Sequence, residues 1–142
     1  MLESKVKERI AEGENRKSQN SKLPAHKRLD ESNIQLDLSG CEIRDVGFIL
    51  ELDDVFNVNL SNNLIEDISA LATCEDLVSL WLTNNLIKDA LPLINLKKLR
   101  SVNISKNKIP LIYGKQKAMI RAALPDAQIF WDSRLRTPNL FG

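Results

Sequence analysis

The sequence predicts an α/β solenoid in which four repeats lay their strands side by side in a concave parallel sheet, with helical caps at the two ends. Three observations support this prediction. Apolar residues recur with a 22-residue period, an asparagine or cysteine recurs in the same register, and 43% of the 142 residues are hydrophobic although only 5% are aromatic. We therefore expect a core of leucine, isoleucine and valine.

Each repeat is anchored by one apolar residue, and these anchors are Leu38, Leu60, Leu82 and Ile104. An apolar residue stands two positions before each anchor, and an isoleucine stands five positions after it. The pattern L-x-L-x-x-N/C-x-I is that of a leucine-rich repeat. Since one repeat cannot bury its own apolar face, we expect neighbouring strands to stack in parallel and in sequence order, near residues 35–37, 57–59, 79–81 and 101–103.

The polar position of the repeat is predicted to be structural. It is occupied by Cys41, Asn63, Asn85 and Asn107. A side-chain amide can both donate and accept, so we expect the asparagines to satisfy backbone groups at the turn after each strand. Cys74 falls in an apolar column of the repeat. Both cysteines are therefore expected to be packing residues rather than nucleophiles.

Residues 1–32 are predicted to form an N-terminal segment of helix and linker. One apolar stripe of this charged helix is formed by Leu2, Val6 and Ile10. Gly13 is expected to end the helix, and the polar residues 14–22 indicate a linker. Pro24 is expected to open a second short helix that ends near Asp30, with Leu23 and Leu29 on the first repeat. Because the apolar stripe is narrow, we expect the first helix to dock on a partner or to stay detached from the repeats.

The repeat domain is predicted to span residues 33–132, of which 113–132 form a C-terminal cap, with a tail at 133–142. Helical spacing is shown by Ala118, Met119, Ala122 and Ala123. A turn at Leu124 and Pro125 and a final short strand should follow. We expect Phe130 or Trp131 to cover the last repeat, because a solenoid otherwise exposes an apolar end.

Charge is segregated along the chain despite a net charge of only +1. Residues 31–76 contain eleven acidic residues and a single basic one, Arg44. Residues 97–136 contain ten basic residues and two acidic ones. If the solenoid keeps sequence order in space, the molecule is an electrostatic dipole.

The 22-residue period, the isoleucines after the asparagines and the ending Leu-Pro-Asp-Ala-Gln-Ile-Phe-Trp-Asp resemble a family of short leucine-rich repeats. This family includes the type-1 protein phosphatase regulator, the A-prime protein of a spliceosomal ribonucleoprotein, the acidic nuclear phosphoproteins and an axonemal dynein light chain. The repeat match covers residues 33–112, and the cap match covers residues 113–132. This chain departs from the family in its low repeat count and in Trp131, which replaces the usual leucine of the cap. The resemblance implies a non-catalytic scaffold or regulatory subunit that binds proteins through the concave sheet.

No catalytic, metal or cofactor motif is found in the sequence. His26 is the single histidine, and it and two cysteines cannot supply the four ligands of a structural zinc site. The five glycines are scattered and form no phosphate-binding loop. No apolar run approaches the roughly 18 residues needed to span a bilayer. We therefore expect a non-enzyme without cofactor or membrane contact, in the cytoplasm or nucleus, and the resemblance adds a cytoskeletal or ciliary setting.

The binding face follows from strand alternation, because every second side chain of a strand points out of the core. The first outward column is Gln35, Asn57, Ser79 and Ser101. The second outward column is Asp37, Asn59, Trp81 and Asn103. A large indole among small polar residues is typical of an interface anchor, although it could instead lie flat on its own sheet. Arg100 and Lys106 near the last strand could add a patch for phosphate or an acidic protein surface.

The sequence thus favours an adaptor or scaffold subunit that binds a protein through its concave sheet. We expect it to be a monomer within a larger complex. Two alternatives stay open. One is a subunit of a ribonucleoprotein, and the other is a regulatory subunit of an enzyme such as a phosphatase or an axonemal motor. Direct nucleic-acid binding is the less favoured reading, because Tyr113 is the single ring among the basic residues.

Overall fold

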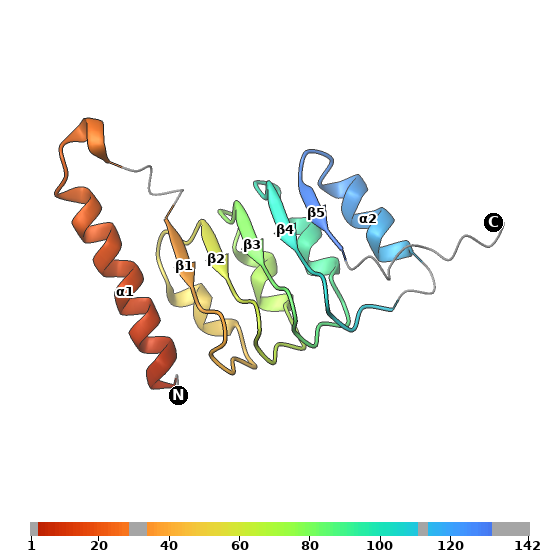
Figure 1. Ribbon diagram of the computed structural model, residues 1–142. Helices are drawn as coiled ribbons and strands as arrows, with labels where there is room; N and C mark the ends of the chain where they lie inside the picture. The colour runs from red at the N-terminus through yellow and green to blue at the C-terminus, as the bar shows by residue number, and fades with distance from the viewer. Residues whose placement is uncertain (1–2, 29–33, 111–113, 132–142) are drawn as a thin grey trace.

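The computed structural model describes residues 3–28, 34–110 and 114–131, and shows a solenoid with one parallel sheet (Figure 1). Five strands pair in sequence order. They are β1 (Gln35–Asp37), β2 (Asn57–Asn59), β3 (Ser79–Trp81), β4 (Ser101–Asn103) and β5 (Gln128–Phe130). All four pairings are parallel, so the four predicted strand positions and their order are confirmed. The predicted final strand of the cap is the fifth member of the same sheet.

The chain returns from each of the first three strands through a short 3-10 helix on the opposite side of the solenoid (Figure 1). These turns are η3 (Gly47–Glu51), η4 (Ser69–Thr73) and η5 (Leu91–Asn95). An aspartate two residues before each turn accepts the first backbone N–H of that turn. Gly47 donates to Asp45, Ser69 to Asp67 and Leu91 to Asp89. The aspartates share the 22-residue period, so part of the acidic charge has a structural use.

The core lies between the sheet and these turns. The anchors Leu38, Leu60, Leu82 and Ile104 have no exposed surface. Val58, Leu80 and Val102 are equally buried in the preceding inward column. Leu36, at the first strand, is only partly buried, because its neighbour is a helix and not another repeat. These two apolar columns of the sequence pattern therefore face inward.

The repeated asparagines satisfy the turns between strands, as the sequence predicts. The Oδ1 atom of Asn63 accepts the backbone N–H groups of Cys41 and Ile43, at 2.9 and 3.0 Å. Its Nδ2 atom donates to the carbonyl oxygens of Leu38 and Leu60, at 3.0 and 2.8 Å. Asn85 and Asn107 repeat this arrangement one and two repeats later. A cysteine has no amide with which to make these bonds to the preceding repeat. The first repeat has no repeat before it, so Cys41 can occupy the position there.

The N-terminal helix α1 (Ser4–Ser21) runs past Gly13, so the predicted stop and the linker at 14–22 are wrong. Gly13 serves a close approach instead. A Cβ atom at this position would lie 3.1 Å from Cδ1 of Leu36, so the helix backbone packs directly on the first strand. The second half of α1 is held by Lys17, whose Nζ donates to the carbonyl oxygens of Asp53 and Asp54 at 3.4 and 2.7 Å.

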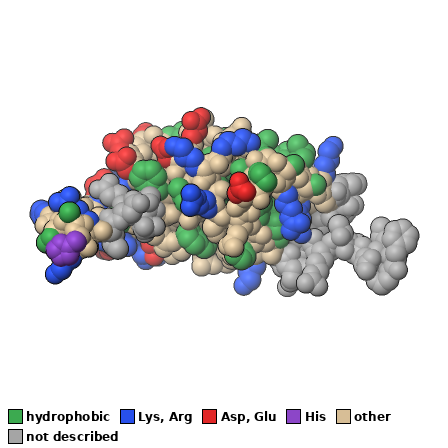
Figure 2. Space-filling model, turned by 90° about the horizontal axis from the view of Figure 1, so that it is seen from above, with side chains coloured by type: hydrophobic (Ala, Val, Ile, Leu, Met, Phe, Trp, Pro, Cys, Tyr) green, Lys and Arg blue, Asp and Glu red, His purple; other side chains and the backbone are tan. Residues whose placement is uncertain are grey.

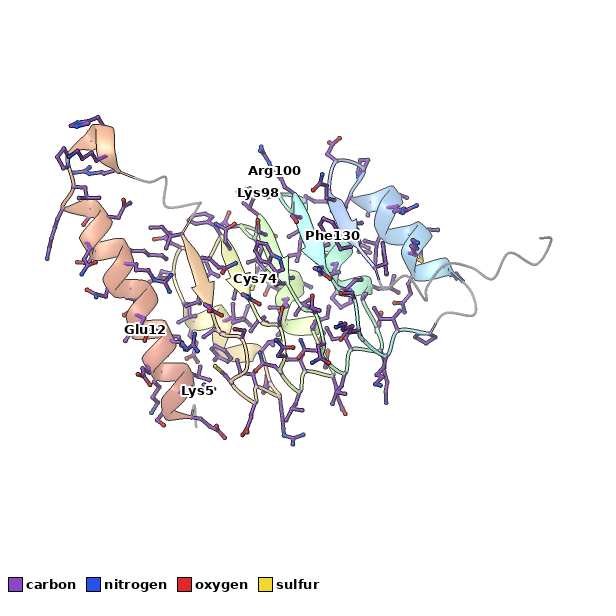
Figure 3. The ribbon with its side chains drawn as sticks, in the orientation of Figure 1. Lys5, Glu12, Cys74, Lys98, Arg100 and Phe130 are labelled. Carbon is purple, nitrogen blue, oxygen red and sulfur yellow. The ribbon has the colours of Figure 1, made fainter. Side chains whose placement is uncertain are left out.

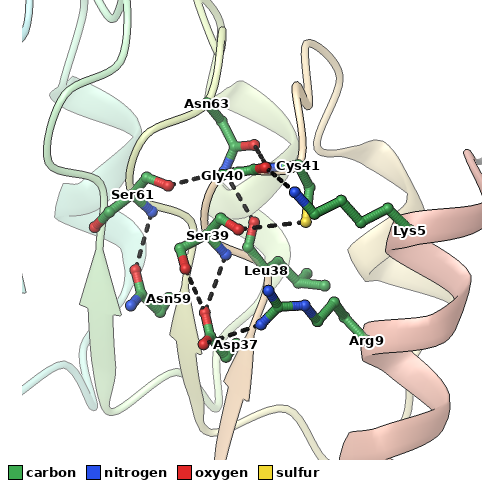
Figure 4. Close-up of polar contacts among 10 residues, drawn as sticks. All are labelled: Lys5, Arg9, Asp37, Leu38, Ser39, Gly40, Cys41, Asn59, Ser61 and Asn63. Carbon is green, nitrogen blue, oxygen red and sulfur yellow. Dashed lines mark hydrogen bonds and ion pairs between the residues drawn. The ribbon is translucent and has the colours of Figure 1, made fainter.

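The expectation that α1 is detached from the repeats is also wrong, because the helix covers the open edge of β1 (Figure 1). Val6 is 3% exposed and belongs to the main core. Lys5 Nζ donates to the carbonyl oxygen of Gly40 at 2.7 Å, and Arg9 pairs with Asp37 at 3.3 Å (Figure 4). A narrow apolar stripe is sufficient here because Lys5 and Arg9, beside it on the helix, bind the first repeat.

The short helix expected after Pro24 is a single 3-10 turn, η1 (Ala25–Lys27). Leu23 is 41% exposed and does not pack on the first repeat as expected. Leu29, Asp30 and the boundary at residue 32 lie outside the described residues.

The C-terminal cap consists of helix α2 (Lys115–Ala123) followed by β5, as the sequence predicts. Ile120 and Leu124 are buried, and Ile129 and Trp131 pack against the core. Lys117 Nζ lies 5.7 Å from the centre of the Trp131 ring, a cation–π contact. Of the two aromatic candidates, Trp131 therefore covers the last repeat, and Phe130 is 50% exposed. Leu2, Tyr113, Asp132 and the tail at 133–142 lie outside the described residues. Within the described part of the chain, no helix is long and apolar enough to cross a membrane.

Candidate protein-binding face

One row of side chains crosses the whole concave sheet at the third position of each strand. The strand register aligns Asp37, Asn59, Trp81, Asn103 and Phe130. The first four are the outward column that the sequence predicts, and Phe130 extends it by one strand. Trp81 and Phe130 are separated by Asn103 alone. The row therefore holds two large rings in its C-terminal half and polar side chains in its N-terminal half.

A second row lies at the first position of each strand and aligns Gln35, Asn57, Ser79, Ser101 and Gln128. Ser79 and Ser101 are half-buried, and their small side chains leave the neighbouring Trp81 accessible. Asn57 differs from the prediction, because it is only 8% exposed and its Nδ2 atom is buried without a hydrogen-bond partner. Asn57 lines a cavity between α1 and the first two strands, so it is not displayed as an outward residue.

In the row at the third strand position, the polar side chains each accept a hydrogen bond at the end of their own strand. The side-chain oxygens of Asp37, Asn59 and Asn103 accept the backbone N–H group two residues later, at 3.1, 3.0 and 3.0 Å. An indole has no acceptor oxygen, so Trp81 cannot make this bond. The third repeat therefore lacks this hydrogen bond at its strand end and has a large, half-buried ring instead. Packing of the core does not explain this choice, because Trp81 is on the side of the sheet away from the core.

Asp37 is already engaged by its own chain. Its Oδ1 atom accepts from the Ser39 hydroxyl at 2.7 Å, and its Oδ2 atom faces Arg9 (Figure 4). Burial raises the pKa of the Asp37 carboxyl, but the bonds from Ser39 and the charges of Arg9 and Arg16 outweigh this and lower it overall. Asp37, a predicted partner contact, therefore holds α1 on the sheet.

Phe130 was not among the predicted binding residues. The sequence offered a signal for it, because Ile129 continues the inward column and strand alternation then places Gln128 and Phe130 outward. The structure confirms this alternation. Gln128 N donates to the Arg100 carbonyl, and Ile104 N donates to the Phe130 carbonyl, so both residues are bonded into β4 while their side chains face outward. The expectation that Phe130 or Trp131 covers the last repeat conflicts with this outward position for Phe130.

The two predicted basic residues lie at opposite ends of β4 and form no single patch. Arg100 precedes the strand and projects from the end of the sheet where the strands begin, near Lys98 (Figure 3). Lys106 follows the strand and is exposed. The Lys106 backbone has φ 55°, in the left-handed region, where the earlier repeats use Gly40, Asn62 and Asn84. Lysine is uncommon in that conformation, so Lys106 has a local conformational cost.

Charge is unevenly distributed over the repeats. Viewed from the end where the strands begin, acidic side chains lie mainly toward the N-terminal half and basic side chains extend toward the C-terminal half, but further basic side chains lie at the N-terminal end beside the histidine of η1 (Figure 2). Lys98 is paired with Asp76 at 2.7 Å, but both side chains are about two-thirds exposed, so the pair adds little stability. Among the described residues after Lys97, Asp126 is the single acidic one. The two rings of the concave row therefore lie in the basic half.

A cavity, the two cysteines and the possible metal ligands were the other candidate sites. A cavity of about 270 Å³ lies between α1 and the first repeat, and its walls include Ile10, Leu36 and Phe56. Burial raises the pKa of the Cys41 and Cys74 thiols, which disfavours the reactive thiolate. Within residues 3–28, 34–110 and 114–131, no group of three or more histidine, cysteine or acidic side chains could hold a metal ion.

The asparagine-supported turns, the parallel concave sheet and the two caps define the class: the chain is a leucine-rich-repeat protein. Similar solved structures support this. Internalin C2 of Listeria monocytogenes matches with a TM-score of 0.58 and 32% identity, over 69% of this chain and 41% of that one. A leucine-rich-repeat protein of Leptospira interrogans matches with a TM-score of 0.57 and 30% identity, over 67% of this chain and 24% of that one. Internalin F of Listeria monocytogenes matches with a TM-score of 0.58 and 29% identity, over 70% of this chain and 28% of that one.

This chain thus spans less than half the length of these relatives. Neither a protein-family model nor a curated protein sequence matches it. Leucine-rich-repeat proteins are in general non-catalytic scaffolds that bind proteins.

Proposed function

We propose that this chain is a non-catalytic adaptor or scaffold that binds a protein partner through its concave sheet, with Trp81 as the energetic anchor. The observation that carries the proposal is the presence of a half-buried tryptophan on the central strand, between two asparagines that accept hydrogen bonds at the ends of their own strands. Tryptophan is enriched among the few residues that dominate binding energy at protein interfaces.

The surroundings of Trp81 support this role. Asn59 and Asn103 flank it in the register, and their Oδ1 atoms are committed to Ser61 and Ser105. Among the described residues, none accepts a hydrogen bond from the Nδ2 atom of either asparagine. Two free amide donors beside an apolar ring can orient a partner backbone and exclude water around the anchor.

Affinity purification with mass spectrometry tests the proposal by comparing the wild-type chain with Trp81→Ala. Leu50→Ala is the matched control, because Leu50 is 52% exposed on η3, on the other side of the solenoid. We expect a protein that is retained by the wild type and by Leu50→Ala and lost by Trp81→Ala. Equal recovery of every partner by all three proteins would contradict a concave anchor.

A ribonucleoprotein-associated role is the second candidate, and the basic C-terminal half favours it. Phosphate binding weakens steeply as salt rises, whereas burial of an apolar ring does not. Titration of a captured complex with salt therefore separates the two. We expect the Trp81-dependent complex to persist at salt concentrations that release nucleic acid. A regulatory subunit of a phosphatase or an axonemal motor would use the same face and falls within the adaptor proposal.

A further inference from the structure

We propose that the concave face recognises an acidic protein segment that carries one large apolar side chain, seated between Trp81 and Phe130. This inference rests on the proposed function and adds the chemistry of the partner. It places the contact on β3, β4 and β5, in the C-terminal half of the sheet. The two rings supply the apolar contact, the asparagines of the row supply donors, and basic residues at the two ends of β4 supply charge.

The rings form the two sides of one apolar seat. Trp81 pairs with Asn103, and Asn103 pairs with Phe130, so the rings are two strand spacings apart, about 10 Å. Phe130 is 50% exposed although Ile129 and Trp131 beside it pack on the core. A leucine, isoleucine or phenylalanine side chain laid over Asn103 would contact both rings.

The polar groups beside the rings select acceptors. The Oδ1 atom of Asn103 accepts from both the N–H and the hydroxyl of Ser105, at 3.0 and 2.6 Å. This fixes the amide and leaves its Nδ2 donors toward the concave side. The Oδ1 atom of Asn59 accepts only the backbone N–H of Ser61, at 3.0 Å. Carbonyl oxygens of an extended partner backbone are the matching groups.

The charges select an acidic segment. Arg100 and Lys106 bracket β4, at most roughly 20 Å apart for six residues of extended chain. A partner segment that runs along β4 would meet a cation on each side of its apolar residue. Lys106 adopts a left-handed conformation that suits glycine or asparagine better, which agrees with a use for its charge. Carboxylates flanking the apolar residue are the complement.

The N-terminal half of the face is excluded by the same reasoning. Asp37 is committed to Arg9 and Ser39, and the repeats around it are acidic. Because Arg9 and Asp37 are already paired with each other, an acidic segment gains less at β1 than at the two ends of β4. The charge separation of the solenoid thus orients the partner as well as attracting it.

A random peptide library selected on the full 142-residue chain tests the inference. We expect the enriched peptides to share a large apolar residue with Asp or Glu on both sides of it. Their affinity should fall at least about tenfold in Trp81→Ala and in Phe130→Ala, and severalfold in Arg100→Gln and Lys106→Asn. Leu50→Ala should bind as the wild type does, and thermal unfolding should show that each variant is folded.

Other outcomes overturn the inference in distinguishable ways. Enrichment of basic peptides, or of none, contradicts the acidic partner. Peptides that need Trp81 but not Phe130 leave the proposed function in place and remove the paired seat. Peptides that need neither ring contradict both proposals. Binding of oligouridylate that depends on Arg100 and Lys106 but not on Trp81 would assign the basic residues to phosphate.

Discussion

The Oδ2 atom of Asp37 on β1 lies 3.3 Å from the Nη1 atom of Arg9 on α1, and this ion pair joins the N-terminal helix to the first strand of the sheet. About a third of each side chain is exposed, so the pair alone contributes on the order of 1 kcal/mol or less. Its position matters more than its strength. With Val6 beneath it and Lys5 beyond it, the pair makes α1 the cap of the apolar end of the solenoid.

The Arg9–Asp37 pair should make stability depend on acidity in a defined direction. The pKa of the Asp37 carboxyl is below its usual value of 3.8, because the Ser39 bonds and nearby arginines outweigh burial. Its stabilisation is therefore full above that value and is lost as the pH falls through the lower folded pKa. We expect Asp37→Asn to be less stable than the wild type at neutral pH. The two thermal midpoints should converge below about pH 4, and a constant difference between pH 7 and pH 3 would contradict the assignment.

Truncation of Val6 measures the role of α1 as a cap. The side chain is 3% exposed in the core cluster, so Val6→Ala should lower the free energy of unfolding by about 2 kcal/mol. Lys7→Ala, at the next and exposed position, is the control and should change it by less than about 0.5 kcal/mol. Chemical denaturation followed by circular dichroism compares the two. Equal midpoints for Val6→Ala and the wild type would show that α1 does not close the core in solution.

Asn63 supports two repeats at once, so its loss should be among the most damaging polar substitutions. Asn63→Ala removes acceptors for two buried N–H groups and donors for two buried carbonyls. We expect a loss of about 3 kcal/mol or more in unfolding free energy. Asn95→Ala, at an exposed position, should have almost no effect. Urea unfolding provides the comparison, and a small effect at Asn63 would mean that water replaces its amide.

Replacement of Lys106 should raise the stability of the fold and weaken binding of an acidic partner. Asparagine tolerates the left-handed region better than lysine, so Lys106→Asn is expected to stabilise the fold by about 0.5 kcal/mol. The same variant should bind an acidic partner more weakly, because it loses one charge at the end of β4. Lys108→Asn removes an equal charge from an exposed position at which φ is not positive, so it should not raise the thermal midpoint. If Lys106→Asn lowers the midpoint, the left-handed backbone is not a cost.

The repeats were predictable because each of their features is local and recurs. A 22-residue period fixes the strands, the inward columns and the asparagine turns together, and each repeat tests the others. The acidic and basic halves followed directly from sequence order, since a solenoid keeps neighbours in the chain adjacent in space.

The segments outside the period were less predictable, because their structure depends on the surface they meet. Glycine commonly ends helices, and the close contact of Gly13 with Leu36 is visible only once the helix is docked. Residues 14–21 are polar and show no apolar stripe, but they extend a helix whose first half is already held. Phe130 and Trp131 could be exchanged in the sequence prediction, and the pairing of β5 with β4 decides between them. Asn57 is buried beside a cavity that α1 helps to form, and a strand pattern does not contain the position of that helix.

The most direct test of the account is a paired measurement on Trp81→Ala: its thermal midpoint by calorimetry, and its affinity for the partner that the wild-type chain retains. Because the ring lies on the concave side, outside the leucine core, we expect the midpoint to stay within a few degrees of the wild type. Affinity should fall by about 2 kcal/mol or more. A variant that unfolds would show that Trp81 is packing, and a folded variant with full affinity would contradict the concave anchor.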